Sequence, residues 1–275
     1  MKILALAVRK GGVGKSAVAF LTARHFAHSG LRVLAIDIDD QGHLSKPIRR
    51  SGKAVVAEIT ADQLFTDPDA AIPVAPFVLV PAGPGLTQLE RESGKGRDVR
   101  NTLASNFRAA LLRAKSNFDV AVIDTPPGID IRLLAALVSA SHVLSPIQLS
   151  DQSISGLVQL LKDPAVGIER IKEMLNPQLD FLGILPNMVE RNPNQVQGMN
   201  DLMANPTFFS RLFSLVDEPK TAADICRIPK REVIRECHTE GLLPFEWKDK
   251  TAARDAWKEL RPVLDRIGVR MGVLA

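Results

Sequence analysis

Residues 9–16 of the chain read Arg9-Lys10-Gly11-Gly12-Val13-Gly14-Lys15-Ser16. They follow an apolar run at residues 2–8, typical of a buried strand, and precede a helical pattern at residues 16–29 that Gly30 terminates. Glycines in such a turn let consecutive backbone N–H groups face an anion, and the helix adds the positive end of its dipole. A glycine-rich turn that happens to carry two lysines is the alternative, but the flanking strand and helix favour a phosphate-binding loop.

The loop departs from the ordinary phosphate-loop pattern Gly-x-x-x-x-Gly-Lys-Ser/Thr, because Arg9 stands where the first glycine is expected. The groups needed for nucleotide chemistry are nevertheless present. Lys15 is expected to reach the β- and γ-phosphates, and the Ser16 hydroxyl is expected to ligate Mg²⁺. The expected nucleotide contacts of the loop are Lys10, Gly11, Gly12, Val13, Gly14, Lys15, Ser16 and Ala17.

Short apolar runs alternate with helical segments along the chain. The predicted strands lie at residues 2–8, 32–38, 77–81, 119–124, 142–147 and 180–186, and the clearest helices at residues 16–29, 99–115, 131–140 and 249–267. This alternation predicts an α/β fold with a doubly wound, mainly parallel sheet flanked by helices. Periodicity is weak at residues 46–75 and 187–224, but no linker or repeat divides the chain, so we expect a single domain over residues 1–275.

Carboxylates close two of the predicted strands. Asp37 and Asp39 are two residues apart, so both point out of the carboxyl end of a strand, where ligands bind in open α/β sheets. Asp124 ends the apolar run that begins at Val120, the arrangement in which a carboxylate polarises a Mg²⁺-bound water. Asp40 is better explained as a cap of the next turn.

The second lysine of the loop makes its interpretation more specific. The run from Lys10 to Ser16 resembles the deviant Walker A motif of the ParA/MinD family of ATPases, whose signature lysine occupies the position of Lys10. The resemblance implies a P-loop NTPase fold, ATP and Mg²⁺ as cofactors, and a homodimer with ATP sandwiched at the interface. Each Lys10 would then reach the phosphates held by the other chain, and would neutralise charge on the transferring phosphoryl group only after two chains have met.

The same resemblance assigns roles to the carboxylates. The run Asp37-Ile38-Asp39-Asp40-Gln41 is similar to the family's second box, which implies that Asp39 orients the attacking water and that Asp37 supports Mg²⁺ and the loop. The run Asp124-Thr125-Pro126-Pro127-Gly128 resembles the turn that senses the γ-phosphate. The expected catalytic residues are Lys10, Lys15 and Asp39, and the expected metal-site residues are Ser16, Asp37 and Asp124.

Two further residues are candidates for contact with the adenine base of the nucleotide. Asn187 follows the apolar run at residues 181–186, where its amide can pair with an adenine edge through both its donor and its acceptor, although asparagine also favours turns. Pro229 follows Ile228 at the place where members of the family carry a proline loop that packs on the base. We therefore expect Asn187 and Pro229 among the nucleotide-binding residues.

Composition limits the class of protein. The 275 residues are 45% hydrophobic and 24% charged, which provides a full core and excludes a disordered chain. Cys226 and Cys237 form no Cys-x-x-Cys pair, so we expect no disulfide scaffold or iron–sulfur site and a reducing, cytoplasmic location. Prolines or polar residues interrupt the uncharged windows at residues 70–89 and 133–150, and residues 3–8 are too short for a signal peptide, so no stable membrane insertion is expected.

Charge is the remaining clue to a partner. Lys and Arg outnumber Asp and Glu by 35 to 31, a mild excess that gives a net charge of +4. Non-specific binding of duplex DNA requires only that phosphates be neutralised, and a dimer doubles every basic patch. The candidate DNA-binding residues near the carboxyl end are Arg227, Lys230, Arg231 and Arg235, among which Glu232 and Glu236 dilute the charge.

These patterns predict a ParA-type partitioning ATPase. It would bind DNA non-specifically and associate with the nucleoid in its ATP state, and it would hydrolyse ATP slowly until a ParB-like partner stimulates it, so as to segregate or position plasmid or chromosome cargo. Two alternatives stay open. One is a MinD-like membrane-cycling ATPase with the apolar tail at residues 269–275 as its anchor, and the other is an ATP-dependent biosynthetic ligase of the same fold.

Overall fold

The computed structural model of the chain describes residues 1–149, 151–164 and 167–275. Its centre is a seven-stranded sheet with the strand order β3-β4-β2-β5-β1-β6-β7, in which all paired neighbours run parallel. The strands are β1 (Lys2–Leu6), β2 (Val33–Asp37), β3 (Val55–Val56), β4 (Phe77–Val80), β5 (Val120–Asp124), β6 (His142–Ile147) and β7 (Asp180–Pro186). The prediction of a parallel, doubly wound α/β fold is confirmed, although the sequence did not indicate the two-residue strand β3.

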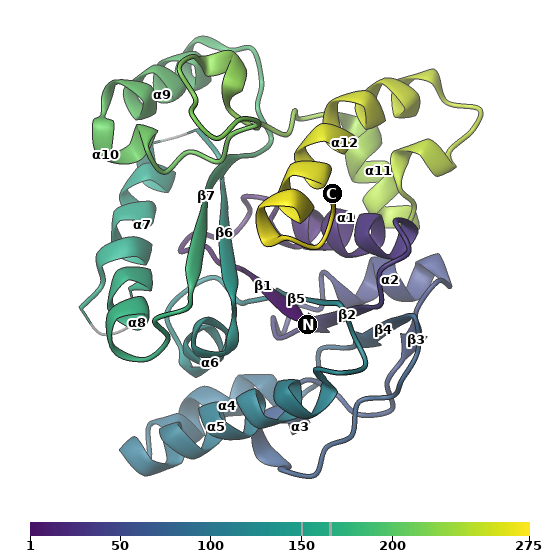
Figure 1. Ribbon diagram of the computed structural model, residues 1–275, viewed down its shortest axis with the longest axis vertical. Helices are drawn as coiled ribbons and strands as arrows, with labels where there is room; N and C mark the ends of the chain where they lie inside the picture. Colours follow the sequence, from purple (N-terminus) through teal and green to yellow (C-terminus); the bar gives the residue numbers. More distant parts are fainter. Residues whose placement is uncertain (150, 165–166) are drawn as a thin grey trace.

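Helices cover both faces of the sheet (Figure 1). Those on one face are α1 (Lys15–His28), α2 (Ser45–Ser51), α11 (Glu232–Glu240) and α12 (Thr251–Met271). Those on the other are α3 (Gln63–Thr66), α4 (Leu86–Ser93), α5 (Arg97–Ala114), α6 (Ile131–Ser139), α7 (Asp151–Lys162), α8 (Ile168–Met174), α9 (Pro193–Ala204) and α10 (Pro206–Phe209). Two short 3-10 turns, Ala222–Asp224 and Pro244–Glu246, complete the described elements.

The sheet separates two apolar cores, one under each helical layer. Side chains alternate between them along a strand, so that Leu34 and Ile36 of β2 belong to one core while Val33 and Ala35 belong to the other. All five residues of β2 and all five of β5 are buried. This explains why the central strands are apolar throughout instead of alternating with polar residues.

Local sequence signals position the helices next to the carboxyl edge of the sheet. The Asp130 carboxylate caps α6 by accepting hydrogen bonds from the backbone N–H groups of Arg132 and Leu133, at 2.9 and 3.1 Å. Asn192 caps α9 in the same way, with Pro193 in the first helical position. These caps fix where the chain turns from the carboxyl edge into the flanking layer.

The carboxyl-terminal helix is longer than the pattern predicted, because α12 runs from Thr251 to Met271 and tolerates Pro262 inside it. Beyond it, the backbone N–H groups of Val273 and Leu274 both donate to the carbonyl of Gly268, and a side chain on Gly268 would collide with Leu274. The end of the chain therefore folds back on its own helix. Within the described residues, no helix combines the length and the apolar character needed to cross a bilayer. That residues 1–275 form a single domain stays a prediction.

Candidate functional site

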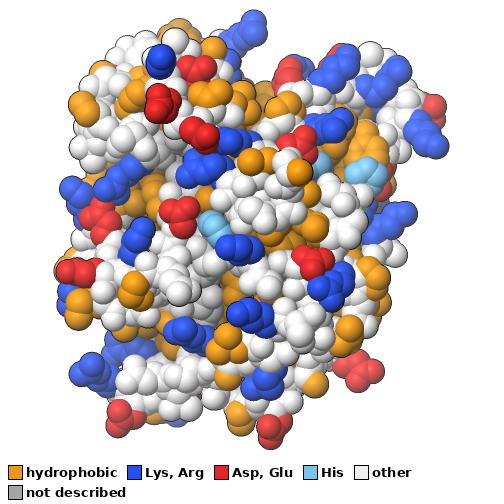
Figure 2. Space-filling view, viewed as in Figure 1, with side chains coloured by type: hydrophobic (Ala, Val, Ile, Leu, Met, Phe, Trp, Pro, Cys, Tyr) orange, Lys and Arg blue, Asp and Glu red, His pale blue; other side chains and the backbone are white. Residues whose placement is uncertain are grey.

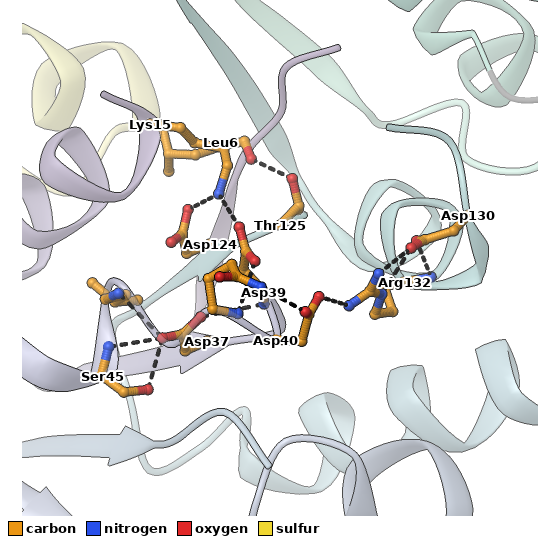
Figure 3. A network of polar contacts seen from close by, with 12 residues as sticks. Leu6, Lys15, Asp37, Asp39, Asp40, Ser45, Asp124, Thr125, Asp130 and Arg132 are labelled. Carbon is orange, nitrogen blue, oxygen red and sulfur yellow. Dashed lines mark hydrogen bonds and ion pairs between the residues drawn. The ribbon is translucent and has the colours of Figure 1, made fainter. Parts of the chain in front are cut away.

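The carboxyl ends of the central strands bring the predicted site residues to one edge of the sheet. In the register, Asp124 at the end of β5 stands beside Leu6 of β1 on one side and Asp37 of β2 on the other. The glycine-rich loop leaves β1 at this edge and enters α1. Figure 3 shows Lys15, Asp37, Asp39 and Asp124 converging here from three separate segments of the chain.

The glycine-rich loop uses backbone conformations that side chains disfavour. Gly12 and Gly14 have φ angles of 78° and 80°, which place both in the left-handed region. At Gly14 space is restricted as well, because a Cβ atom there would lie 2.4 Å from Nδ2 of Asn187. Both glycines are therefore required for the curl of the loop.

Arg9, the departure from the ordinary pattern, turns away from the loop. The Cβ atom of Arg9 lies 3.4 Å from the position that a Cβ atom on Gly156 of α7 would occupy. The guanidinium of Arg9 donates a hydrogen bond to Oε1 of Gln159 at 3.3 Å. The arginine is therefore accommodated because α7 has a glycine opposite it. The loop keeps its curl without the first glycine of the pattern.

Lys15 is buried between two carboxylates. Its ammonium is ion-paired with Oδ1 of Asp124 and lies 3.6 Å from Oδ2 of Asp39. Asp124 is completely buried, and burial raises the pKa of its carboxyl, although Lys15 and the Ser16 hydroxyl act in the opposite direction. The lysine that is expected to hold phosphates is thus also the cation that pairs with the carboxylates of this site.

The donor set at the end of β5 suits a divalent cation. Oδ2 of Asp124 is buried and has no hydrogen-bond partner among the described residues, so it is an orphaned acceptor that a cation or its water would satisfy. The described residues contain no cluster of three or more His, Cys, Asp or Glu side chains able to hold a metal by themselves. Mg²⁺ is commonly bound through one or two carboxylates with phosphate and water oxygens, so Asp124 and Ser16 fit that ion.

Asp37 holds the loop that follows β2. Its Oδ2 accepts hydrogen bonds from the backbone N–H and the hydroxyl of Ser45, both at 2.7 Å, and from the Leu44 N–H at 3.2 Å. Its Oδ1 accepts from the Asp39 N–H at 3.2 Å. Burial, and after it the charge of Asp124, raises the pKa of Asp37 to about 7. Support of the loop is therefore visible, whereas ligation of Mg²⁺ by Asp37 stays a prediction.

Asp40 does not cap the next turn, so that interpretation is wrong. The N–H groups at the start of α2 go to Asp37 instead. The Asp40 carboxylate pairs at 2.9 Å with the guanidinium of Arg132, which also binds the Asp130 carboxylate at 2.6 and 2.8 Å (Figure 3). Hydrogen bonding from Arg132 lowers the pKa of Asp40. Sequence reasoning missed Arg132, although Asp130 before an apolar helical pattern is an ordinary N-cap signal.

Asn187 and Pro229 lie on adjacent segments beside the loop. The Asn187 side chain is buried and its Nδ2 donates to the carbonyl of Val13 at 2.7 Å, so it touches the glycine-rich loop directly. Residues 226–230 run alongside the chain after β7, with the Val189 N–H donating to Ile228 O at 3.0 Å. Contact with a base stays a prediction for both residues.

The candidate DNA-binding residues are mostly paired with acids. Lys230 lies 3.2 Å from Glu190, Arg231 is bonded twice to Glu259, and Arg235 is bonded to Glu232 on its own helix. Arg227, Lys230 and Arg231 line, with Pro229, a cavity of about 1000 Å³ between the segment after β7 and α12. Figure 2 shows basic side chains scattered among acidic ones on the face in view. Whether these residues touch DNA stays a prediction.

Comparison with known proteins agrees with this geometry. A family model described as an AAA domain matches residues 1–181. The chain is 32% identical over 285 residues to the protein IncC of Escherichia coli, covering 99% of this chain and 71% of that protein. It is 28% identical over 272 residues to the chromosome partitioning protein ParA of Caulobacter vibrioides, with 97% of this chain and 95% of the relative covered.

A solved structure shows the same fold at lower identity. The ATP complex of a McdA variant from Cyanothece superposes with a TM-score of 0.69 at 20% identity, and covers 95% of this chain and 96% of that one. The family model, the curated relatives and the loop with lysines at positions 10 and 15 agree. The chain belongs to the ParA/MinD family of deviant Walker A P-loop ATPases.

Proposed function

We propose that the chain is a ParA-type partitioning ATPase that binds ATP with Mg²⁺ and hydrolyses it slowly. The observation that carries this proposal is the convergence of Lys15, Asp39 and Asp124 at one edge of the sheet, next to a loop whose glycines adopt the curl that phosphates require. The relative described as chromosome partitioning protein ParA points to partitioning as the process that the ATPase drives.

The residues divide the work as follows. The N–H groups of residues 11–16 and the ammonium of Lys15 bind the phosphates, and Lys15 leaves its two carboxylates to do so. Asp39 orients the attacking water, and Asp37 holds the Asp39 loop through the Asp39 N–H. When bound through Asp124 and Ser16, Mg²⁺ would supply positive charge against the phosphate oxygens. Asn187 and Pro229 contact the adenine.

Dimerisation couples nucleotide occupancy to activity in this proposal. Two chains face each other across their carboxyl edges with two ATP molecules between them, and Lys10 of each chain contacts the phosphates held by the other. Because this cation arrives only with a second chain, an isolated chain lacks part of the charge that the transition state requires. The monomer therefore turns over slowly, and a ParB-like partner raises the rate.

Non-specific duplex DNA is the surface on which the ATP-bound dimer acts. The cavity-lining residues Arg227, Lys230 and Arg231, together with Arg235, are the proposed contacts. Glu190, Glu259 and Glu232 pair with three of these four cations in one chain. Binding is therefore weak for a monomer and adequate for a dimer, which would place the protein on the nucleoid only in its ATP state.

The fold-back of the chain end argues against the membrane-cycling alternative. Val273 and Leu274 are partly buried against the core that α12 shares with α1, so the apolar side chains of the tail already have a partner. A ligase of the same fold would have no use for Lys10 and would need a pocket for a second substrate beside the phosphates. ATP hydrolysis that needs no second substrate and depends on Lys10 would distinguish the partitioning ATPase from the ligase.

The deciding experiment measures binding to arbitrary duplex DNA with ATP, with ADP and without nucleotide, across a series of salt concentrations. The proposal expects binding in ATP only, with an affinity that falls steeply as salt rises. Lys15→Ala is the matched control, since it should bind no DNA under any of these conditions. Absence of DNA binding at low salt with ATP would contradict the proposal, and binding to anionic vesicles instead would favour the membrane-cycling alternative.

A further inference from the structure

One guanidinium joins the loop that carries Asp39 to the loop that follows Asp124. Arg132, in the first turn of α6, binds Asp40 in the loop after β2 and Asp130 at the end of the loop after β5. The Arg132 side chain is only 11% exposed, and the Asp40 and Asp130 side chains are 28% and 14% exposed. Because these charges are largely removed from water and the fork of arginine matches carboxylate oxygens, this contact is stronger than an ordinary surface ion pair.

Asp39 lies between two anchors of its loop. On one side its N–H donates to Asp37, whose carboxylate is held in turn by Ser45. On the other side its neighbour Asp40 reaches toward α6 and Arg132 (Figure 3). Because Asp40 directly follows Asp39, the contact of Asp40 with Arg132 restrains the backbone that carries the Asp39 carboxylate.

The first turn of α6, which contains Arg132, is itself tied to the loop that follows Asp124, at residues 125–130. The Thr125 hydroxyl donates to the carbonyl of Leu6 at 2.7 Å, which holds the start of the loop to β1. The other end is held by Asp130, whose carboxylate caps α6 and binds Arg132. Between them Gly128 has a φ angle of 124°, a conformation that residues with a side chain rarely adopt. A rearrangement of residues 125–130 would therefore reach Asp39 through Arg132 and Asp40.

We propose that Arg132 is a positioning residue for ATP hydrolysis, because its ion pair with Asp40 holds the Asp39 loop against the loop that follows Asp124. The inference rests on the proposed ATPase function. Arg132 acts through Asp40, and so affects the orientation of the attacking water more than the binding of ATP. Small displacements of a positioning group are costly in rate, and loss of the clamp should lower kcat about tenfold while the KM for ATP changes less than twofold.

The chain offers a matched control on the same two strands. Arg32 and Asp119 form a bidentate pair, with contacts at 2.7 and 3.3 Å, just before β2 and β5 begin. Asp40 and Arg132 tie the segments that follow the ends of those strands. Arg32→Met therefore removes an arginine and an ion pair between the same strands at the opposite edge, and should leave kcat unchanged.

The experiment is a double-mutant cycle on kcat and KM with the full chain, using Arg132→Met, Asp40→Ala and the double variant. If Arg132 acts through Asp40, the double variant turns over as fast as Asp40→Ala alone. Arg132→Lys, which keeps the charge but not the fork, should recover part of the rate. Hydrogen exchange without nucleotide should be faster at residues 39–42 in Arg132→Met and unchanged there in Arg32→Met.

The outcomes distinguish a failure of the proposed positioning role of Arg132 from a failure of the proposed ATPase function. Wild-type turnover together with normal turnover of Arg132→Met would overturn the role of Arg132 alone. A double variant much slower than Asp40→Ala would also overturn it, since Arg132 would then act without Asp40. A wild-type chain that leaves ATP intact would overturn the proposed function and, with it, this role.

Discussion

The ammonium of Lys15 lies 3.6 Å from Oδ2 of Asp39 while it is ion-paired with Asp124. This one cation, itself predicted to bind phosphate, thus holds together a group predicted to orient water and a group predicted to face Mg²⁺. When a nucleotide attracts Lys15, it leaves two carboxylates whose negative charge favours the arrival of another cation. Nucleotide and metal should therefore enter this site together.

Lys15→Ala should abolish nucleotide binding, with the Kd for ATP raised at least 100-fold. It should also lower the free energy of unfolding of the nucleotide-free chain by about 3 kcal/mol, because a buried carboxylate loses its partner. Lys15→Arg is the matched variant, since it keeps the cation between the carboxylates but presents a planar head to the phosphates. Titration calorimetry and denaturant unfolding test both effects, and a threefold or smaller change in Kd for Lys15→Ala would contradict the role.

Asp39→Ala should bind ATP and form dimers without turnover. The Asp39 side chain contacts Lys15 and the Gln41 N–H. Because Asp39 lies in the loop after β2 and not in a strand, the fold should survive removal of its side chain. We expect kcat to fall at least 100-fold, while the dimer persists in ATP by analytical ultracentrifugation. Normal turnover in this variant would remove the assignment.

Lys10→Ala should impair dimerisation while leaving ATP binding nearly unchanged. If Lys10 acts on the phosphates of a second chain, a monomer retains its own contacts through Lys15 and the loop amides, and ATP affinity should change less than fivefold. Sedimentation in ATP should then show a monomer, and turnover should fall at least tenfold. A dimeric, fully active Lys10→Ala would show that the lysine serves no partner.

Two substitutions near the 1000 Å³ cavity should move DNA affinity in opposite directions. Arg227→Ala removes a cation and should weaken ATP-dependent binding, with the salt slope smaller by about one per chain. Glu259→Gln frees Arg231 from its pair and should strengthen binding severalfold. Glu173→Gln, which makes the same charge change at the partner of Arg170 on α8, is the control. Equal effects of the two Glu→Gln changes would mean that net charge alone matters.

Asp37→Asn should change the pH dependence of stability. The pKa of Asp37 is about 7 in the folded chain and about 4 when unfolded, so between those values the folded chain holds a proton that the unfolded chain has lost. The stability that this proton contributes is present below about pH 4 and is lost as the pH rises to about 7. The wild type should therefore lose more Tm than Asp37→Asn between pH 5 and 8.

The size of that difference is several degrees, because one pKa unit corresponds to about 1.4 kcal/mol and 1 kcal/mol shifts Tm by about 2–4 °C in a chain of this size. Burial lowers the pKa of His25, His142 and His238, which act in the opposite sense. They are common to both variants, so the difference between the two curves reports the interacting pair of Asp37 and Asp124. Parallel Tm curves across this range would contradict the assignment.

The features that the sequence predicted depend on neighbours in the chain. Buried strands reveal themselves by apolar runs, and the loop from Lys10 to Ser16 carries its glycines and lysines within a few residues. Strand β3 has two residues, Val55 and Val56, and α3 has four, which are too short for a periodic pattern. The helix α2, which contains Pro47, lies almost wholly in the stretch at residues 46–75 where periodicity is weak.

Contacts between residues that are far apart in the sequence could not be predicted from it. Asp40 and Arg132 are 92 positions apart and Asn187 and Val13 are 174 apart, and both pairs meet only because parallel strands deliver their ends to one edge. Asp40 also illustrates a competition between partners. Asp37 satisfies the N–H groups at the start of α2, which leaves Asp40 for Arg132.

The hydrogen bond from Asn187 to Val13 bears on which purine the site prefers. Because the loop carbonyl accepts from Nδ2, the orientation of the amide is fixed, and one N–H and the carbonyl oxygen remain for another partner. That donor and acceptor pair matches the exocyclic amine and ring nitrogen of adenine, whereas guanine presents an oxygen where adenine has its amine. If Asn187 contacts the base as proposed, the glycine-rich loop, by turning one amide, would thus favour ATP over GTP without itself touching the base.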